Sequence, residues 1–535
     1  MDTPICDFVR NYTQSGTRRL HMPGHKGQGP LGFEYLDITE ISGADSLYEA
    51  DGIIASSEEN ASRLFGCPTF YSTEGASQCI RAMLYLCLLR AKKEGRKPLI
   101  AAGRNAHKVL LSAAALLDVD IHWLWPQDGG SYLCCPITAQ MLDKALSDMD
   151  EKPVAVYITT PDYLGNMADV AALAEVAHSH GCLLAVDGAH GAYLRFLPRS
   201  LHPMDLGADL CCSSAHKTLP VLTGGAYLHT SPALASDAKD ALALFGSTSP
   251  SYLILQSLDA ANAALAGEFP HQLAQTTQAV TDLKARLTGY RFLGDEPTKL
   301  TIDAKAYGYT GTELAERLRQ KGLECEFADP DFLVLMCGTG TDFADLEAVL
   351  SSVSPQASLP DAAPRLCRPQ RAMSIWEATL SPSKIVPAEQ SLGKVLAAAT
   401  VGCPPAVPII VCGERIDYQT IDVFQYYGIK TCRIVIEERK KRTADRSALS
   451  LFTKEQLHGR PISLGIQKDT QAVAGIGHGD QQFLAGAGLK ILPAHVTRYE
   501  IVAFAVEENH RDFAFLNHFH RRRLLQIKAA VEPCA

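Results

Sequence analysis

Short apolar runs recur between residues 98 and 230, and each is bounded by charged or turn-forming residues. The runs are rich in Val, Ile, Leu and Ala, a composition that favours buried strands. Nearly continuous apolar strands indicate a sheet covered on both faces, in a three-layer α/β domain. The strands are predicted at Leu99–Ala102, Val154–Thr159, Cys182–Asp187, Asp209–Ser213 and Ala226–His229.

Apolar residues at helical spacing lie before and between these strands. One helical pattern begins near Ser56, and a second follows Gly75 as far as Leu89. Asp169 is suited to cap a helix between two of the strands, and Gly181 is suited to end it. The alternation of strand and helix is typical of βαβ units.

The pattern changes again toward the C-terminal half. A helix-rich stretch at about residues 253–287 leads to strands near Lys299–Ile302 and Phe332–Met336, which predict a second, smaller α/β domain. We therefore expect an N-terminal arm at 1–35, a large domain at 36–265, a smaller C-terminal α/β domain at 266–437 and a tail at 438–535. The tail contains Gly475–Gly479 and His518–Arg523, and neither stretch supports a functional assignment.

Composition narrows the class of protein. The 535 residues carry a net charge of −9 with both signs mixed along most of the chain, so no nucleic-acid partner is expected. No apolar run reaches the roughly 20 residues that a spanning helix needs, and no leader pattern follows Met1, so we expect no membrane partner and a cytoplasmic location. The 16 cysteines form no CxxC pair, and no metal site is expected.

Candidate chemistry gathers at the ends of two predicted strands. Lys217 follows one strand and Asp187 ends its neighbour, at the sheet edge where ligands of open α/β sheets bind. A lysine there can form a Schiff base, and an aspartate can pair with a protonated pyridine nitrogen, the two polar contacts that pyridoxal phosphate (PLP) chemistry needs most. The turn Phe70–Ser77, which runs from an extended segment through Gly75 into a helix, is suited to hold a phosphate. Each residue alone is better explained as a loop or turn residue, but together they favour a PLP site.

The chain resembles the Orn/Lys/Arg decarboxylases over about residues 15–435, in the short form that lacks an N-terminal receiver-like domain. Eight separate stretches carry the resemblance: His21–Gly27, Asp37–Glu40, Asp51–Ile54, Arg104–Lys108, Asp187–His190, Ser214–Lys217, Ser247–Tyr252 and Pro404–Arg415. It implies the aspartate-aminotransferase-like fold of PLP-dependent transferases (fold type I), with a large domain that binds PLP and a smaller C-terminal α/β domain.

The resemblance also implies a role for each matching residue. Lys217 would bind PLP covalently, Asp187 would pair with its ring nitrogen, and His107 would stack on its ring. The remaining cofactor contacts would be Gly75, Ala76, Ser77, His190, Ser214 and His216, and His216 or Lys217 would return a proton to the α-carbon. At Ala76 many relatives carry a hydroxyl residue, so one phosphate contact is expected to be missing.

Two further implications concern the substrate and the assembly. Glu414 matches an acid that faces the distal cation of the substrate, a task suited to a carboxylate. Ser247–Ser251 matches a loop that reaches the cofactor phosphate of the neighbouring subunit, which implies a homodimer or a higher homo-oligomer with active sites at the subunit interface.

The expected function is therefore that of a lyase, a PLP-dependent decarboxylase of a basic amino acid. Arginine is the first substrate candidate, followed by lysine and ornithine, and the product would be an amine of polyamine biosynthesis. An aminotransferase or carbon-sulfur lyase of the same fold would share Lys217 and Asp187, and a catalytically silent regulatory or binding protein would share the fold alone. All three alternatives are open at this point.

Overall fold

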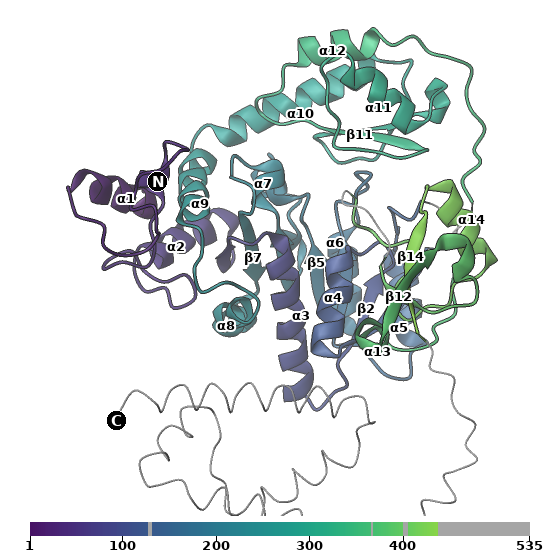
Figure 1. The fold of residues 1–535 in the computed structure, drawn as a ribbon, viewed down its shortest axis with the longest axis horizontal. Coiled ribbons are helices and arrows are strands. Elements are labelled where there is room, and N and C mark those ends of the chain that lie inside the picture. The colour runs from purple at the N-terminus through teal and green to yellow at the C-terminus, as the bar shows by residue number, and fades with distance from the viewer. Residues whose placement is uncertain (127–130, 365–367, 400–404, 437–535) are drawn as a thin grey trace, which may run out of the picture. The chain divides into compact units, whose positions relative to one another are not determined.

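A seven-stranded sheet forms the centre of the part of the chain that the computed structural model describes, residues 1–126, 131–364, 368–399 and 405–436 (Figure 1). The strand order is β1-β7-β6-β5-β4-β2-β3, and β7 alone runs antiparallel to its neighbours. The strands are β1 (Thr69–Ser72), β2 (Leu99–Gly103), β3 (Asp120–Leu124), β4 (Ala155–Thr159), β5 (Leu183–Asp187), β6 (Leu210–Ser213) and β7 (Ala226–Thr230). All five strands predicted between residues 98 and 230 are present, within one or two residues at each end.

Helices cover both faces of this sheet, which confirms the three-layer arrangement. Alternate residues of a strand point to opposite faces: Leu183 and Ala185 pack with α3, α4 and α8, whereas Leu184 and Val186 pack with α5 and α6. The helices are α2 (Ile53–Phe65), α3 (Ala76–Lys93), α4 (Lys108–Leu117), α5 (Ala139–Ser147), α6 (Val170–Ser179), α7 (Ala215–Thr218), α8 (Ala238–Ala243) and α9 (Tyr252–Ala266). Asp169 caps α6 as predicted, since its carboxylate accepts a hydrogen bond from the amide of Ala172.

The first residues of the chain take part in the core, contrary to the expectation of an arm. Helix α1 (Pro4–Gln14) fully buries Ile5 and Val9 in the apolar cluster that also holds residues of α2 and α9. The Asp259 carboxylate accepts hydrogen bonds from the amides of Ile5 and Cys6, which fixes the start of α1 to α9. Ile5, Phe8, Val9 and Tyr12 have the spacing of one helix face, but the polar, glycine-rich residues that follow them favoured the interpretation as an arm.

Two small antiparallel sheets follow α10 (Phe269–Arg286). The four-stranded sheet has the order β10-β11-β9-β8, and the three-stranded sheet has the order β12-β14-β13. Their strands are β8 (Phe292–Leu293), β9 (Lys299–Asp303), β10 (Phe327–Ala328), β11 (Phe332–Met336), β12 (Ser383–Pro387), β13 (Leu396–Ala398) and β14 (Thr431–Val435), and their helices are α11 (Gly311–Arg319), α12 (Phe343–Ser351), α13 (Ile375–Leu380) and α14 (Tyr418–Tyr426). The two strands predicted here are therefore β9 and β11.

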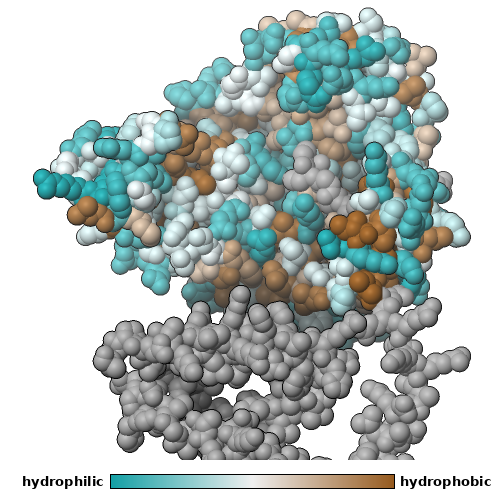
Figure 2. All heavy atoms as spheres, viewed as in Figure 1, coloured by the Kyte–Doolittle hydropathy of each residue, from teal (hydrophilic) through white to brown (hydrophobic). Residues whose placement is uncertain are grey.

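The surface of the described chain is mostly polar on the face that Figure 2 shows, with an apolar group toward its lower right. Exposed large apolar residues in α13 and β12 are Trp376, Leu380 and Ile385. Within the described ranges, no helix is both long and apolar enough to cross a membrane. The predicted domain boundaries stay a prediction, and the stretches noted at Gly475–Gly479 and His518–Arg523 lie outside the described residues.

Candidate active site

A cavity of about 550 Å³ opens at the carboxyl ends of β4, β5 and β6. Because these strands are parallel neighbours, their last residues meet at one edge of the sheet, where the chain leaves each strand in a loop or a short helix. Nine of the ten residues predicted for the site line this cavity: Gly75, Ala76, Ser77, His107, Asp187, His190, Ser214, His216 and Lys217. Glu414 is the exception.

Lys217 lies on the short helix α7 directly after β6, and its amine contacts His190. The distance between Lys217 Nζ and His190 Nε2 is 3.0 Å. Burial, followed by the charge of Lys217, holds the pKa of His190 well below its usual range, so the imidazole is neutral and Nε2 accepts the hydrogen bond. Nδ1 then carries the ring proton, and it is a buried donor without a partner among the described residues.

Asp187 ends β5 with its carboxylate in the cavity, and only 2% of the residue is exposed. Its oxygens accept hydrogen bonds from the Tyr157 hydroxyl at 3.1 Å, the Ala189 amide at 3.2 Å and the Cys212 thiol at 3.5 Å. All three donors are neutral, so the carboxylate is held in place without a bound cation. A buried acid in this state is suited to pair with a cationic ring nitrogen.

His107 stands at the start of α4 and faces the same cavity. Its Nδ1 accepts a hydrogen bond from the Val109 amide at 3.2 Å, which caps the helix and fixes the ring. Burial lowers the pKa of His107, although the charge of Asp187 raises it in part. A neutral, fixed imidazole on the cavity wall is suited to stacking on a planar ligand.

The phosphate-binding turn lies where β1 leads into α3. Gly75 adopts φ +72° and ψ 177°, a conformation that glycine alone adopts readily, and a Cβ atom there would meet nothing within 4 Å. The amides of Ala76 and Ser77 lie in the first turn of an 18-residue helix, where no intrahelical acceptor exists. The free amides and the open space in front of Gly75 are suited to an anion.

His216 lies on α7 directly before Lys217, and Ser214 is the N-cap residue of that helix. The Nδ1–H group of His216 donates to the Gly225 carbonyl at 3.0 Å, and burial lowers the pKa of this histidine, so its other nitrogen carries no proton. The Ser214 carbonyl accepts from the amide of Lys217. The cavity thus contains the amine of Lys217, the carboxylate of Asp187 and the anion-binding turn at Gly75–Ser77. These three groups together fit PLP.

Glu414 lies away from this cavity, contrary to the expectation that it faces the substrate. It is 4% exposed and lines a separate cavity of about 760 Å³ beside Trp123 and Trp125. One oxygen of its carboxylate is 3.0 Å from the guanidinium of Arg104. Burial raises the pKa of Glu414, and Arg104 offsets part of the rise.

Glu326 is a residue of the cavity that sequence reasoning missed. It precedes β10, and its carboxylate accepts a hydrogen bond from the Tyr163 hydroxyl at 2.8 Å. Among the described residues that line the cavity, Asp187 is the only other acid. Glu326 reaches the cavity through the pairing of β10 with β11, a contact that no local sequence signal marks.

Comparison with known proteins agrees with this geometry. The family model "Orn/Lys/Arg decarboxylase, major domain" matches residues 3–293. The arginine decarboxylase of Bacillus subtilis is 27% identical over 461 residues, which covers 78% of this chain and 92% of that protein. The arginine decarboxylase of Halalkalibacterium halodurans is 28% identical, and the match covers 77% of this chain and 91% of that protein.

Solved structures share the fold at lower identity. The lysine decarboxylase of Francisella novicida superposes with a TM-score of 0.68 at 16% identity and covers 81% of each chain. The constitutive lysine decarboxylase of E. coli superposes with a TM-score of 0.65 at 18% identity and covers 81% of this chain and 82% of that one. These likenesses show the predicted fold, that of the fold type I PLP enzymes.

Proposed function

Because the chain belongs to the Orn/Lys/Arg decarboxylase family, a family of PLP-dependent amino-acid decarboxylases, we propose that it removes the α-carboxyl group of a basic amino acid as carbon dioxide. Arginine is the first candidate, since the curated relatives include arginine decarboxylases, and lysine and ornithine follow. The product would be the corresponding amine of polyamine biosynthesis, formed in the cytoplasm. The observation that carries this proposal is the meeting of Lys217, Asp187 and the Gly75–Ser77 turn in one cavity.

The residues present fit PLP. Lys217 would hold the cofactor covalently, Asp187 would keep its ring nitrogen protonated, His107 would lie on its ring, and the Gly75–Ser77 turn would hold its phosphate. When bound, PLP supplies an electron sink that accepts the electron pair left on the α-carbon as carbon dioxide departs. His190, Ser214 and His216 would complete the contacts.

Lys217 is the better candidate for returning a proton to the α-carbon. His216 has its only ring proton on Nδ1, where it is bound to the Gly225 carbonyl. Burial lowers the pKa of His216, which makes a second proton on that ring costly. The Lys217 amine carries protons and lies within hydrogen-bonding distance of a neutral acceptor, His190, which can hold it in place.

Glu326 is the proposed partner of the distal cation of the substrate. Once Asp187 is paired with the cofactor, Glu326 is the remaining acid among the described lining residues. The buried Lys299 amine donates to the Asp162 carbonyl at 3.1 Å, and among the described residues it forms no ion pair with Glu326. A carboxylate held by the neutral Tyr163 hydroxyl suits an ammonium or a guanidinium.

A homodimer is also proposed, with Ser247–Ser251 as the loop that reaches the cofactor phosphate of the neighbouring subunit. In the described chain the Glu74 carboxylate accepts a hydrogen bond from the Ser247 amide, and Glu74 precedes Gly75 of the phosphate-binding turn. The loop is therefore tied to the segment that carries the turn. This contact lies within one subunit, so it supports a position of the loop near a phosphate-binding turn, and its assignment to the neighbouring subunit rests on the resemblance to the family.

An absorbance spectrum of the purified protein tests the function. We expect a visible band from the lysine-bound cofactor that Lys217→Ala loses, and carbon dioxide on addition of arginine, lysine or ornithine. A band without carbon dioxide from any of the three would favour an aminotransferase or a carbon-sulfur lyase instead. No band even after addition of PLP would leave a catalytically silent protein.

A further inference from the structure

One wall of the active-site cavity is formed by a proline-dense segment, Pro405–Val411, which we call the wall segment. Pro405 and Val407 line the cavity directly. The segment forms no strand or helix, and Ala406 has φ +56°, so it has no ladder of its own hydrogen bonds to hold it. Its backbone is held by other parts of the chain instead.

Arg104 provides two of these contacts. The residue follows β2, and its guanidinium donates to the Pro408 carbonyl at 3.1 Å and to the Ile409 carbonyl at 3.0 Å. Four residues later, the Lys108 amide donates to the Ala406 carbonyl at 2.8 Å. The wall segment is thus bound to the same loop that carries His107.

Glu414 completes this arrangement. One carboxylate oxygen accepts from Arg104 at 3.0 Å and from the Val411 amide at 2.8 Å. The Arg104 and Glu414 side chains are only 6% and 5% exposed. Glu414 therefore orients Arg104 and holds the end of the wall segment at the same time, through a single carboxylate oxygen.

Two tryptophans enclose the pair. The Arg104 guanidinium lies 5.2 Å from the ring of Trp123 and 5.1 Å from that of Trp125. Only the planar fork of arginine can reach two carbonyls and a carboxylate while it stacks on aromatic rings, so lysine is a poor substitute. The chain has three tryptophans, and these two make the fluorescence of the protein a reporter of the pair.

We propose that the Arg104–Glu414 pair fixes the wall segment against the cavity and thereby sets which length of basic side chain the cavity accepts. Glu414 is then a positioning residue that acts through Arg104, and it does not touch the substrate. This inference rests on the proposed function. Buried ion pairs contribute little net stability compared with apolar replacements, so a role in fixing one arrangement suits this pair better than a role in stability.

The test compares three changes at the pair, made in the cofactor-loaded protein. They are Glu414→Gln, Arg104→Lys and the double change Arg104→Met with Glu414→Met. The double change leaves no unpaired buried charge, so we expect it to fold even if a single change prevents folding, and the proposal can then still be tested. For each we would measure calorimetric binding of ornithine, lysine and arginine, the carbon dioxide released, the cofactor absorbance and the quenching of tryptophan fluorescence by acrylamide.

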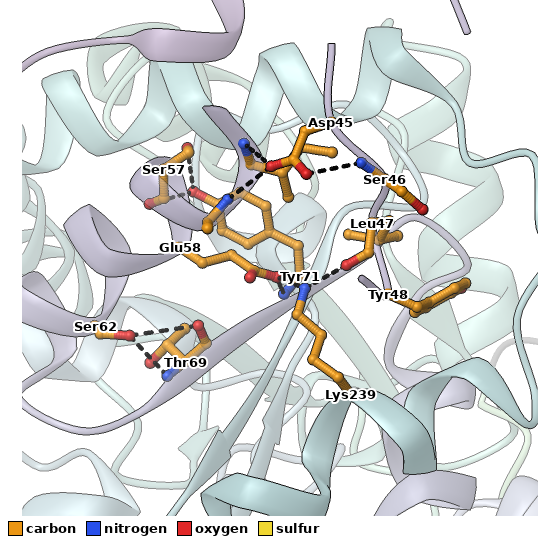
Figure 3. A network of polar contacts seen from close by, with 12 residues as sticks. Asp45, Ser46, Leu47, Tyr48, Ser57, Glu58, Ser62, Thr69, Tyr71 and Lys239 are labelled. Carbon is orange, nitrogen blue, oxygen red and sulfur yellow. Dashed lines mark hydrogen bonds and ion pairs between the residues drawn. The ribbon is translucent and has the colours of Figure 1, made fainter. Parts of the chain in front are cut away.

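A matched control is the buried ion pair of Glu58 with Lys239 (Figure 3). Its side chains are 7% and 18% exposed, and neither residue lines the cavity. The Glu58 carboxylate also accepts from the Tyr71 amide, as Glu414 accepts from Val411. Glu58→Gln therefore removes a comparable buried pair without touching the wall segment.

We expect all three changes at the pair to reduce the preference among the three amino acids by about tenfold or more, the scale of discrimination that one methylene group gives in a fixed pocket. Cofactor absorbance should remain, and acrylamide should quench the tryptophans more strongly. Glu58→Gln should lower the melting temperature and leave the preference unchanged.

Three results would overturn the inference. The preference could stay unchanged in every folded variant, or Glu58→Gln could reduce it equally. Alternatively, Glu414→Gln could weaken binding of all three amino acids alike while Arg104→Lys does not, which would show that Glu414 contacts the substrate.

The wild-type protein distinguishes failure of this inference from failure of the proposed function. If it binds the amino acids with a preference but releases no carbon dioxide, the proposed function alone is refuted, since the preference still tests the pair. A wild-type protein that binds none of the three amino acids would refute both.

Discussion

Burial lowers the pKa of each of the three histidines that line the active-site cavity. Each also has one ring nitrogen committed to a neighbour: His107 accepts from Val109, His190 accepts from Lys217, and His216 donates to Gly225. The three imidazoles are therefore uncharged near neutral pH. Their neutral state leaves the carboxylate of Glu326 without a competing imidazolium.

Glu326→Gln should weaken binding of the distal cation of the substrate and leave binding of the rest of the substrate unchanged. Loss of a charged hydrogen bond costs about 1.5–3 kcal/mol, so we expect KM for the preferred basic amino acid to rise about 10- to 100-fold, with little change in binding of norleucine. Steady-state kinetics and binding of the two ligands would measure this. Glu324→Gln, two residues away and exposed, is the control. An unchanged KM in Glu326→Gln would assign the distal contact elsewhere.

At the scale of elements, the strand ends were predictable and the contacts between distant segments were not. Apolar runs located β2, β4, β5, β6 and β7 because those strands are buried on both faces. Strand β3 was missed, since Asp120 and His122 interrupt its apolar residues and it lies at the sheet edge. Lys217, Asp187 and the Gly75 turn follow directly from strand ends, whereas Glu326 depends on the packing of a separate sheet.

Glu414, unlike Glu326, was marked by a sequence motif, but the motif did not predict its contacts. Its motif is specific, so the sequence marked it as important, but motif spacing says nothing about which side of the wall segment its side chain faces. The structure turns it toward Arg104. Arg104 itself belonged to a recognised stretch, Arg104–Lys108, without an assigned role. The contact between two motifs about 300 positions apart in the chain could be found only from the fold.

Helix α2 and strand β7 pack together through a buried histidine that should make stability depend on pH. His202 lies 5.5 Å from the Phe65 ring and 4.8 Å from the His229 ring, and burial lowers its pKa from 6.5 to about 4. The unfolded chain therefore takes up a proton near pH 6.5 that the folded chain refuses until about pH 4. Neutral His202 therefore contributes on the order of 3 kcal/mol to the free energy of unfolding above pH 6.5, and this contribution is lost as the pH falls toward 4.

His202→Asn should flatten this dependence. Asparagine can keep the hydrogen bond from the Met204 amide, which His202 accepts at Nδ1, but it does not titrate. We expect the free energy of unfolding to fall less between the upper and lower ends of that pH window than in the wild type, as measured by denaturant titration. His271→Asn, at an exposed position on α10, should leave the slope unchanged. An unaltered slope in His202→Asn would assign the dependence to other groups.

At the scale of the whole molecule, subunit mixing tests the proposed dimer. Lys217→Ala removes the amine of a site, and Thr248→Glu should repel the cofactor phosphate that the Ser247–Ser251 loop reaches. If the loop serves the neighbouring subunit, a mixed dimer has one site with both parts intact. Equal mixing should then restore about a quarter of the wild-type rate, because half of the dimers are mixed and one of their two sites works. No recovery in verified mixed dimers would mean that the loop serves its own subunit.

The antiparallel strand β7 also has a consequence for how the protein is made. Among the described residues, strand β1 pairs with β7 alone, and residues 226–230 leave the ribosome roughly 150 positions after residues 69–72. At about 5–20 residues per second, β1 waits roughly 8 to 30 seconds with an unpaired edge while β2 to β6 emerge. We expect this interval, rather than the finished fold, to be the stage at which the nascent chain depends most on chaperones.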